Sequence, residues 1–333
     1  MQALRIDRPG VAGLVDLPLP EPGPHDAVVR VHACGICGTD VHIFRGEYLG
    51  DYPVIPGHEA AGEVVQVGAE VTRFRVGDRV AIEPNIPCDA CYACLHNRQN
   101  FCLNWQAIGV TRPGAMAELV LVPEKALFDI GALPFEHGAF VEPLSCVLHG
   151  IEQASIRMGD RVAILGAGPI GLLLLQAVRL QGAVAIDVLE RQAARGSLAQ
   201  AYGAARVVAG LEELEADHYD VVIDATGVPG LMASGPKLAR RGGTVLLFGV
   251  PPRGSKLALD AFALFEKGLT LCSSFTSLRN SYQAIALLQS GQIVVSDLIS
   301  HRLPLSSFER GITLIEQGLE DVRKVLLLPH LPA

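Results

Sequence analysis

The sequence predicts an α/β protein in two parts: a mainly β first part, and a second part built on a doubly wound parallel sheet. Three observations support this prediction. Up to about residue 145 the apolar segments are short, rich in valine and bounded by glycine or proline, as strands are. Beyond that point apolar strands alternate with helical segments, which indicates a parallel sheet. A glycine-rich turn at residues 166–171 joins one of these strands to a helix.

The strands of the first part are expected to form a barrel-like sheet, because they are short and separated by turn residues. The segments with this character are residues 27–33, 62–67, 78–82 and 117–122. Proline occupies every second position from Pro18 to Pro24. Because proline has no backbone N–H to donate to a neighbouring strand, we expect this stretch to be an extended surface connection.

The second part is expected to contain parallel strands connected by helices. The strands are residues 161–165, 184–189, 219–224 and 244–249, and a final segment adds a helix at 282–289 and a strand at 324–328. The run 162–178 is almost wholly apolar, but a membrane-spanning helix needs about 20 apolar residues. Glycines and a proline interrupt this run, so it is interpreted as a buried strand, turn and helix.

Composition excludes some classes of function. The chain has 333 residues, half of them hydrophobic, which is enough for two folded domains and argues against disorder. The net charge of −8 and the pI of about 5.7 argue against a nucleic-acid partner, which would need a concentrated basic surface. The first residues lack the charged head and apolar run of a signal peptide, so we expect a cytoplasmic protein without a membrane partner.

Four cysteines lie close together in a segment with little apolar periodicity: Cys88, Cys91, Cys94 and Cys102. Two, two and seven residues separate them, a spacing that lets four thiolates surround one Zn²⁺ without help from distant parts of the chain. Four protein ligands leave no open coordination place, so this zinc is predicted to be structural. The alternative is two disulfides or free buried thiols, and disulfides are rare in reducing compartments.

The glycine-rich turn has the form of a dinucleotide-binding site. Its residues are Gly166, Ala167, Gly168, Pro169, Ile170 and Gly171. The turn follows the strand 161–165 and opens a helix, whose N-terminal N–H groups attract a pyrophosphate. Glu190 ends the next strand, 19 residues after Gly171, where a carboxylate can bind the ribose hydroxyls and repel a 2′-phosphate.

The carboxylate of Glu190 therefore favours NAD over NADP. Arg191 and Arg195 follow it and either could accommodate a phosphate, so NADP remains a possible coenzyme. Asp187 is the weaker alternative to Glu190, because strand alternation turns it away from the ribose or into the packing of the sheet.

Several motifs together resemble those of one enzyme family. They are Cys34-Gly35-Ile36-Cys37-Gly38-Thr39-Asp40, Gly57-His58-Glu59 and the four-cysteine segment. With these motifs the chain resembles the zinc-containing medium-chain alcohol and polyol dehydrogenases over its whole length. The resemblance implies a GroES-like catalytic domain at residues 1–145, with the zinc lobe at 86–103, and a Rossmann dinucleotide-binding domain at 146–273. Residues 274–333 would then return to the catalytic domain.

The resemblance also implies a catalytic zinc ion, whose ligands are too scattered for spacing to indicate them. The ligands would be Cys37, His58 and a glutamate, either Glu59 or Glu142. Thiolate, imidazole and carboxylate all bind zinc, and three protein ligands leave one coordination place for water or an alcohol. Which of the two glutamates completes the set stays open.

Further site residues follow from the resemblance alone. Thr39 and His42 resemble the family's proton relay from a hydroxyl to an imidazole. Thr226, Gly249 and Val250 would line the nicotinamide end of the coenzyme site. Candidates for the substrate pocket are Phe44, Tyr48, Phe275 and Arg279.

The implied function is an oxidoreductase with two zinc ions per subunit that transfers hydride between a secondary alcohol and NAD to give a ketone. A polyol such as sorbitol or arabitol is favoured, because Glu142 and residues 142–150 are similar to sorbitol and arabitol dehydrogenases. The alternatives are an L-threonine 3-dehydrogenase, a 2,3-butanediol-type dehydrogenase and, more remotely, a nucleotide-binding protein without catalysis. Because bacterial members of the family are usually tetramers, we expect a homotetramer.

Overall fold

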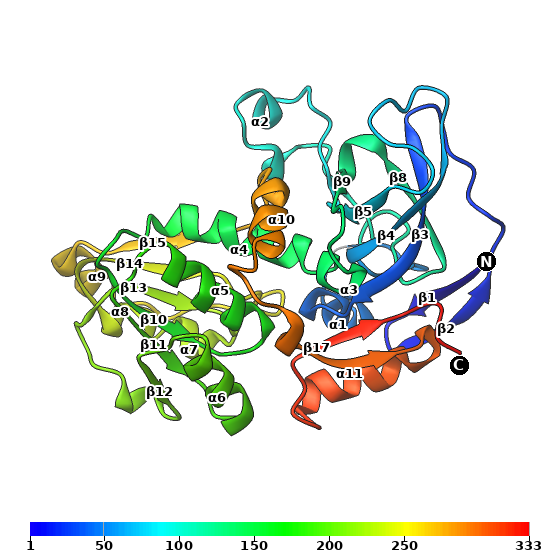
Figure 1. Ribbon diagram of the computed structural model, residues 1–333. Coiled ribbons are helices and arrows are strands. Elements are labelled where there is room, and N and C mark those ends of the chain that lie inside the picture. The colour runs from blue at the N-terminus through cyan, green and yellow to red at the C-terminus, as the bar shows by residue number, and fades with distance from the viewer. Residues whose placement is uncertain (49, 333) are drawn as a thin grey trace. The chain divides into compact units, whose positions relative to one another are not determined.

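The computed structural model describes residues 1–48 and 50–332. Two compact units are present (Figure 1). The first unit is Met1–Ser145 together with the C-terminal segment from Ser277, and the second unit is Cys146–Thr276. The sequence led us to expect the second boundary after residue 273. The predicted fold class is confirmed, because the first unit is mainly β and the second contains a doubly wound parallel sheet.

The first unit is built on a seven-stranded sheet in the order β16-β17-β3-β4-β5-β9, with β8 paired to β3. Its strands are β3 (Asp26–Gly35), β4 (Glu59–Val67), β5 (Arg79–Ile82), β8 (Leu119–Pro123), β9 (Leu127–Asp129), β16 (Ile299–Leu303) and β17 (Lys324–Leu327). Two small antiparallel pairs accompany it: β1 (Gln2–Arg8) with β2 (Val11–Asp16), and β6 (Asn85–Ile86) with β7 (Gln106–Ala107). The β1–β2 hairpin was not among the predicted strands.

Helices of the first unit are short, apart from the helix that leads into the second unit. They are α1 (Gly38–Arg45), α2 (Tyr92–Leu95), α3 (Phe135–Gly138), α4 (Val141–Ala154), α10 (Ser281–Gln289) and α11 (Phe308–Gln317). Single 3₁₀ turns lie at η1 (Gln99–Phe101), η2 (Glu124–Ala126), η4 (Ser296–Leu298) and η5 (Leu305–Ser307). Helix α4 belongs to both units, because the boundary falls after Ser145.

Strand β3 is the centre of the first unit. It pairs antiparallel with β4 along its length, with β8 over its first half and with β17 at its end. Most of its side chains are buried, which agrees with its valine-rich sequence. The register sets Gly35, the last residue of β3, opposite Glu59, the first residue of β4. The polar residues of the candidate site therefore begin where the apolar core of this sheet ends.

The second unit is a six-stranded parallel sheet in the order β12-β11-β10-β13-β14-β15. The strands are β10 (Arg161–Leu165), β11 (Ala185–Leu189), β12 (Arg206–Val208), β13 (Tyr219–Asp224), β14 (Ala239–Leu247) and β15 (Thr270–Ser273). The helices are α5 (Pro169–Leu180), α6 (Ala193–Ala201), α7 (Pro229–Met232), α8 (Gly235–Leu238) and α9 (Ala261–Lys267), with a 3₁₀ turn at η3 (Leu211–Glu213). Strands β12 and β15 were not predicted.

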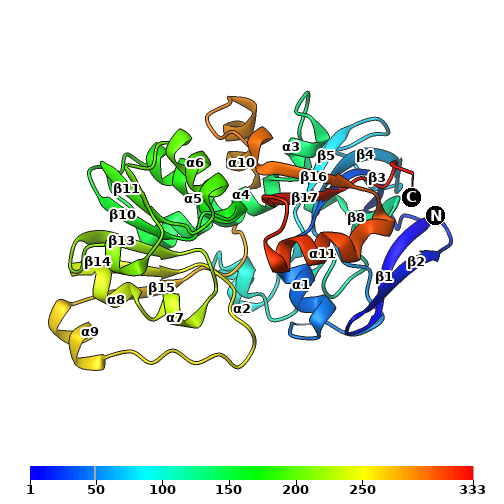
Figure 2. The ribbon, with the colours of Figure 1, turned by 90° about the horizontal axis from the view of Figure 1, so that it is seen from below.

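Strand order in this sheet creates a switch point between β10 and β13, where the chain reverses its direction of winding. Ligands of doubly wound sheets bind beyond the carboxyl ends of the strands at such a point. Figure 2 shows α5 and α6 on one face of the sheet, with α7 and α8 on the other. Because both faces are covered, β10 and its neighbours are apolar on both sides.

The apolar run 162–178 forms β10, the glycine-rich turn and most of α5, as the sequence predicted. Most of its side chains are buried in the second unit. Across the described residues, 1–48 and 50–332, the structure holds no helix with the length and apolar character that crossing a membrane requires.

One carboxylate anchors the C-terminal segment to the sheet of the first unit. Glu83, just after β5, accepts hydrogen bonds from Ser277 Oγ (2.7 Å), Ser281 Oγ (2.9 Å) and Asn85 Nδ2 (2.6 Å). Both serines are buried and lie at the start of the segment that follows the second unit. Glu83 is therefore a fixed point at which the chain rejoins the first unit.

Replacement of this anchor tests its contribution to stability. Glu83→Ala removes the acceptor of two buried hydroxyls, so we expect a loss of about 1–3 kcal/mol in the free energy of unfolding. Urea unfolding followed by tryptophan fluorescence measures it. The control is Glu266→Ala, which breaks the exposed Arg241–Glu266 pair and is expected to cost about 0–1 kcal/mol. Equal losses in the two variants would contradict the anchoring role.

Candidate functional site

Three potential metal ligands converge at the end of β3. The ligating atoms of Cys37, His58 and Glu59 all lie within 4.8 Å of one another. Cys37 is the N-cap of α1, and His58 and Glu59 stand at the start of β4. His58 and Glu59 are buried, and Cys37 is half-buried. We call these three residues the Cys37 cluster. They bring together a thiol, an imidazole and a carboxylate, which is a donor set suited to zinc.

Asp40 holds the two loops that carry this cluster. Its fully buried carboxylate accepts hydrogen bonds from Cys37 N (2.8 Å) and Gly57 N (3.2 Å). Asp40 Oδ1 also lies 3.6 Å from His58 Nδ1, on the side where a carboxylate orients a metal-binding imidazole. Asp40 belongs to the motif 34–40, but its sequence context did not predict this role. Its position three residues after the helix N-cap, Cys37, was the only local signal.

Lys324 is a second residue that sequence reasoning missed. It opens β17, is buried, and forms an ion pair with Glu59. Burial alone would lower the pKa of Lys324, but the charges of Glu59 and Cys37 raise it above its ordinary value, so the ammonium group stays charged. Gly35 lies against this pair, and a Cβ there would collide with both side chains.

The electrostatics of the Cys37 cluster fit a cation. Burial would lower the pKa of His58, yet Asp40 and Cys37 together raise it well above the ordinary value. Negative potential at this point thus outweighs desolvation in a buried site. The same negative potential would favour a divalent cation bound by the Cys37 thiolate and neutral His58.

Glu142, the other candidate acid, lies in the first turn of α4 and is buried. Its backbone carbonyl accepts a hydrogen bond from Ser145 Oγ at 2.7 Å. Its carboxylate is not among the ligand atoms that the described residues group within 4.8 Å, whereas that of Glu59 is. On geometry alone, Glu59 is thus the nearer acid to Cys37 and His58.

The proposed relay residues share one helix. Thr39 and His42 lie three residues apart on α1, so their side chains project from the same face. His42 Nδ1 lies 3.0 Å from Glu47 Oε2. Of the substrate-pocket candidates, Phe44 packs edge-on against Phe308 and also belongs, like Tyr48, to the packing around the core of the first unit. Arg279 and Phe275 fall in different units, and both are exposed.

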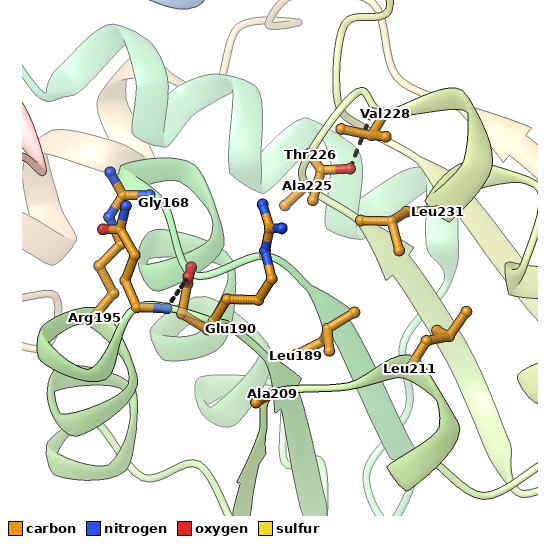
Figure 3. Close-up of a pocket in the computed structure, with 13 residues that line it drawn as sticks. Gly168, Leu189, Glu190, Arg195, Ala209, Leu211, Ala225, Thr226, Val228 and Leu231 are labelled. Carbon is orange, nitrogen blue, oxygen red and sulfur yellow. Dashed lines mark hydrogen bonds between the residues drawn. The ribbon is translucent and has the colours of Figure 1, made fainter. Parts of the chain in front are cut away.

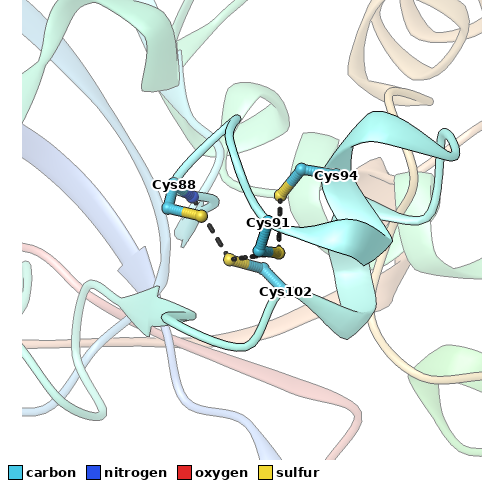
Figure 4. A group of neighbouring side chains, drawn as sticks. All are labelled: Cys88, Cys91, Cys94 and Cys102. Carbon is cyan, nitrogen blue, oxygen red and sulfur yellow. Dashed lines mark hydrogen bonds between the residues drawn. The ribbon is translucent and has the colours of Figure 1, made fainter.

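The four cysteines of the lobe form a second cluster, shown in Figure 4. Cys91 Sγ lies 3.5 Å from Cys94 Sγ and 3.8 Å from Cys102 Sγ. A tetrahedron with Zn–S bonds of about 2.3 Å has S–S edges of about 3.8 Å, whereas a disulfide would need about 2.05 Å. All eight cysteines of the chain are free. The spacing therefore fits a metal and excludes the disulfide alternative.

Backbone N–H groups support this thiolate cluster. Cys102 Sγ accepts from Cys88 N (3.2 Å) and Asn104 N (3.3 Å), and Cys91 Sγ accepts from Leu103 N (3.5 Å). Backbone hydrogen bonds, with help from the neighbouring thiol of Cys102, lower the pKa of Cys88 to about 6. Since zinc binds thiolates, donors aimed at sulfur favour metal binding.

A cavity with a volume of about 590 Å³ lies in the second unit. Figure 3 shows Gly168, Glu190 and Arg195 around one end of it, and Thr226, Val228 and Leu231 around the other. It opens at the glycine-rich turn before α5, beyond the carboxyl ends of β10 and β11. This is the place where a doubly wound sheet binds a dinucleotide.

Glycines at the turn serve close packing. Gly166 has φ of 98°, and a Cβ on Gly171 would collide with the Gly166 carbonyl oxygen. Pro169, the first helical residue, and Ile170 complete the first turn of α5. The helix N-terminus is thus free to approach an anionic ligand.

Glu190 uses both carboxylate oxygens within the protein. Oε2 accepts from Ala167 N (3.0 Å) in the glycine-rich turn, and Oε1 accepts from Gln192 N (2.8 Å). Arg191 and Arg195 line the same cavity. Asp187 is instead buried, where it accepts from Tyr219 OH at 2.8 Å. The carboxylate and two guanidinium groups thus share the end of the cavity where a ribose would lie.

At the other end of the cavity, Asp224 organises the backbone. Buried at the end of β13, it accepts from Thr226 Oγ1 (2.6 Å) and Gly227 N (3.0 Å), and burial raises its pKa despite these bonds. Gly249 packs directly on Gly227, and its N–H donates to the Asp224 carbonyl at 2.9 Å. Val250 is half exposed beside them. This role of Asp224 was not predicted from the sequence.

The fold and these sites define a dehydrogenase that uses zinc and a nicotinamide dinucleotide. The model of the alcohol dehydrogenase GroES-like domain matches residues 23–132, and that of zinc-binding dehydrogenases matches residues 169–290. D-altritol 5-dehydrogenase of Agrobacterium fabrum is 38% identical over 92% of this chain and 93% of that protein. L-threonine 3-dehydrogenase of Thermococcus kodakarensis is 33% identical over 99% and 98%. This chain belongs to the zinc-containing medium-chain alcohol and polyol dehydrogenases.

A solved structure agrees with this family. A zinc-binding dehydrogenase from Sinorhizobium meliloti, crystallised with NADP, is 39% identical and superposes with a TM-score of 0.94 over 98% of this chain and 99% of that one. The predictions of a zinc-dependent alcohol or polyol oxidoreductase, and of Zn and NAD(P) as its cofactors, are confirmed.

Loss of one lobe cysteine tests the closed metal site. Cys94→Ser removes a buried thiol from the four, so we expect zinc content to fall to one ion per chain and the melting temperature to drop, because structural zinc contributes folding energy. Elemental analysis and thermal unfolding measure the two effects. Cys272→Ser, on β15 outside both clusters, should retain both ions. A Cys94→Ser protein that keeps two zinc ions would refute the assignment.

Proposed function

We propose that this enzyme oxidises a secondary alcohol of a small polyol, such as sorbitol, arabitol or altritol, to the ketone with NAD. The observation that supports the proposal most directly is the Cys37 cluster, three zinc-type ligands in one buried place. The relatives named as polyol dehydrogenases support the substrate class. Lys324, the cation buried beside the cluster, is already paired with Glu59, so it is not free to bind the carboxylate of threonine.

In this proposal the residues of the Cys37 cluster hold the catalytic zinc, with Glu142 as the alternative acid. Zinc, when bound, favours the deprotonated form of the alcohol, and NAD(P) accepts the hydride. Asp40 orients His58 and fixes the backbone of Cys37. Lys324 forms an ion pair with Glu59 and holds its carboxylate in place. Each of these contacts restricts a ligand before substrate arrives, which is the preorganisation that catalysis requires.

The alcohol proton leaves through Thr39 and His42. A threonine hydroxyl can accept one proton while it donates its own, and an imidazole can carry a proton near neutral pH. His42 is only partly exposed, with 17% of its side chain accessible, so a proton that reaches it has a short path to solvent.

The catalytic assignment predicts a selective loss. Cys37→Ser weakens one ligand of the open metal site, so we expect turnover to fall by at least about a hundredfold. Coenzyme binding, measured by fluorescence titration, and the lobe zinc should persist, because neither involves Cys37. Cys272→Ser serves again as the control and should keep full activity. An unchanged rate in Cys37→Ser would refute the proposal.

Substrate class is tested with a panel. Purified enzyme is expected to reduce NAD with sorbitol, arabitol or altritol and to turn over L-threonine and 2,3-butanediol at least about tenfold more slowly, as measured by NADH absorbance. Turnover of threonine alone would contradict the polyol assignment. Zinc-replete enzyme that binds NAD but oxidises none of these alcohols would instead favour a nucleotide-binding protein without catalysis.

We propose that the enzyme prefers NAD to NADP. The preference would depend on the balance between the carboxylate of Glu190 and the guanidinium groups of Arg191 and Arg195. The carboxylate repels a 2′-phosphate and the guanidinium groups attract it. Arg195→Ala is therefore expected to weaken the binding of NADP by about tenfold or more and the binding of NAD by much less. Binding titrations with both coenzymes measure the ratio. Equal weakening of NAD and NADP would refute a role in phosphate recognition.

We also propose a cytoplasmic homotetramer. Free cysteines throughout the chain suit a reducing compartment. In the second unit β15 is an edge strand, and α9 exposes Phe262 and Phe265, which favours contact with another subunit. Light scattering of the purified protein gives its mass directly.

A further inference from the structure

Glu47, a residue outside the motifs of the site, contacts His42 twice, once through its backbone and once through its side chain. Glu47 lies just beyond α1, after Gly46, which closes the helix in the left-handed conformation (φ 78°, ψ 23°). Its backbone N–H donates to the carbonyl of His42 (2.8 Å), as in a Schellman turn. Its side-chain Oε2 lies 3.0 Å from His42 Nδ1. The helix end thus places Glu47 against the residue whose orientation the relay requires.

The side-chain contact decides which nitrogen of His42 carries the proton. An ionised carboxylate only accepts hydrogen bonds, so Nδ1 must donate to Glu47. In neutral imidazole the other nitrogen, Nε2, is then the acceptor. The hydroxyl of Thr39 can pass a proton to His42 only if Nε2 is free to accept it. Without Glu47 the ring could rotate, or it could exchange to the tautomer whose Nε2 is already protonated.

We propose that Glu47 is a positioning residue of the proton relay, which holds His42 in the tautomer with Nε2 open and stabilises the imidazolium after Nε2 has gained the proton. This inference rests on the proposed function, because it takes the Thr39–His42 relay as given. The imidazolium then loses one proton to water, and 38% of the Glu47 side chain is exposed beside it. A carboxylate has the same effect wherever it orients a catalytic imidazole.

Two replacements of Glu47 separate positioning from simple packing. Glu47→Gln keeps an oxygen acceptor for Nδ1 and loses the charge, whereas Glu47→Leu loses both. We expect kcat to fall by about tenfold or more in Glu47→Leu and by less in Glu47→Gln. KM, zinc content and coenzyme affinity should stay as in the wild type. Added imidazole should restore part of the kcat of Glu47→Leu.

The direct readout is ¹⁵N NMR of histidine-labelled enzyme, with the His42 signals assigned by their loss in His42→Asn. The wild type and Glu47→Gln should show Nδ1–H, and Glu47→Leu should shift toward Nε2–H. The matched control is Glu70→Leu, because Glu70 pairs with His25 at the same distance, 3.0 Å, on an exposed surface. That variant should change neither kcat nor the His42 signals.

Contrary outcomes identify which claim is wrong. If His42→Asn is slow but Glu47→Leu keeps the wild-type kcat and tautomer, the inference about Glu47 is overturned and the relay stands. If His42→Asn keeps full kcat, the relay and this inference are both overturned. If wild-type enzyme oxidises no polyol, the proposed function is wrong. An Nε2–H tautomer in that same wild-type enzyme would overturn the inference by itself.

Discussion

Buried negative charge at the end of β3 is the constraint on which the candidate active site depends. Asp40 and Glu59 are almost wholly buried, and Cys37 adds a thiol that ligates as an anion. An ionised group away from water is costly unless it is paired. Asp40 is held by backbone N–H groups, and Lys324 neutralises Glu59. In the proposed function a metal ion would balance the charge of the Cys37 thiolate, as Lys324 balances that of Glu59.

The ion pair between Glu59 and Lys324 joins distant parts of the chain. Lys324 arrives on β17, which pairs with β3 only after the whole second unit has been traversed. Glu83 fixes the start of the same returning segment through Ser277 and Ser281. The first unit is therefore complete only when both ends of the chain have folded together, and the ion pair at Glu59 forms with that closure. Because β17 both pairs with β3 and carries Lys324, the same strand contributes to the stability of the sheet and to the arrangement of Glu59.

The sequence predicted what depends on local spacing and missed what depends on pairing. The four lobe cysteines fall within fifteen residues, so their pattern alone indicated a metal, and the glycine-rich turn was equally local. The Cys37 cluster is scattered, and only a family resemblance indicated it. Lys324 could not be found, because it lies 265 positions after Glu59 and an isolated lysine has no periodicity. Strands β12 and β15, of three and four residues, were too short to show a pattern.

The two candidate metal clusters differ in the number of their donors, and this difference supports the different roles proposed for them. In the lobe, the four sulfur atoms lie within 4.8 Å of one another, so an ion bound by all four would have no place for another ligand. The Cys37 cluster offers three donors, and its nearest carboxylate is shared with Lys324. An ion held by the three donors of the Cys37 cluster would keep one coordination place for an alcohol, whereas an ion held by the four thiolates of the lobe would keep none.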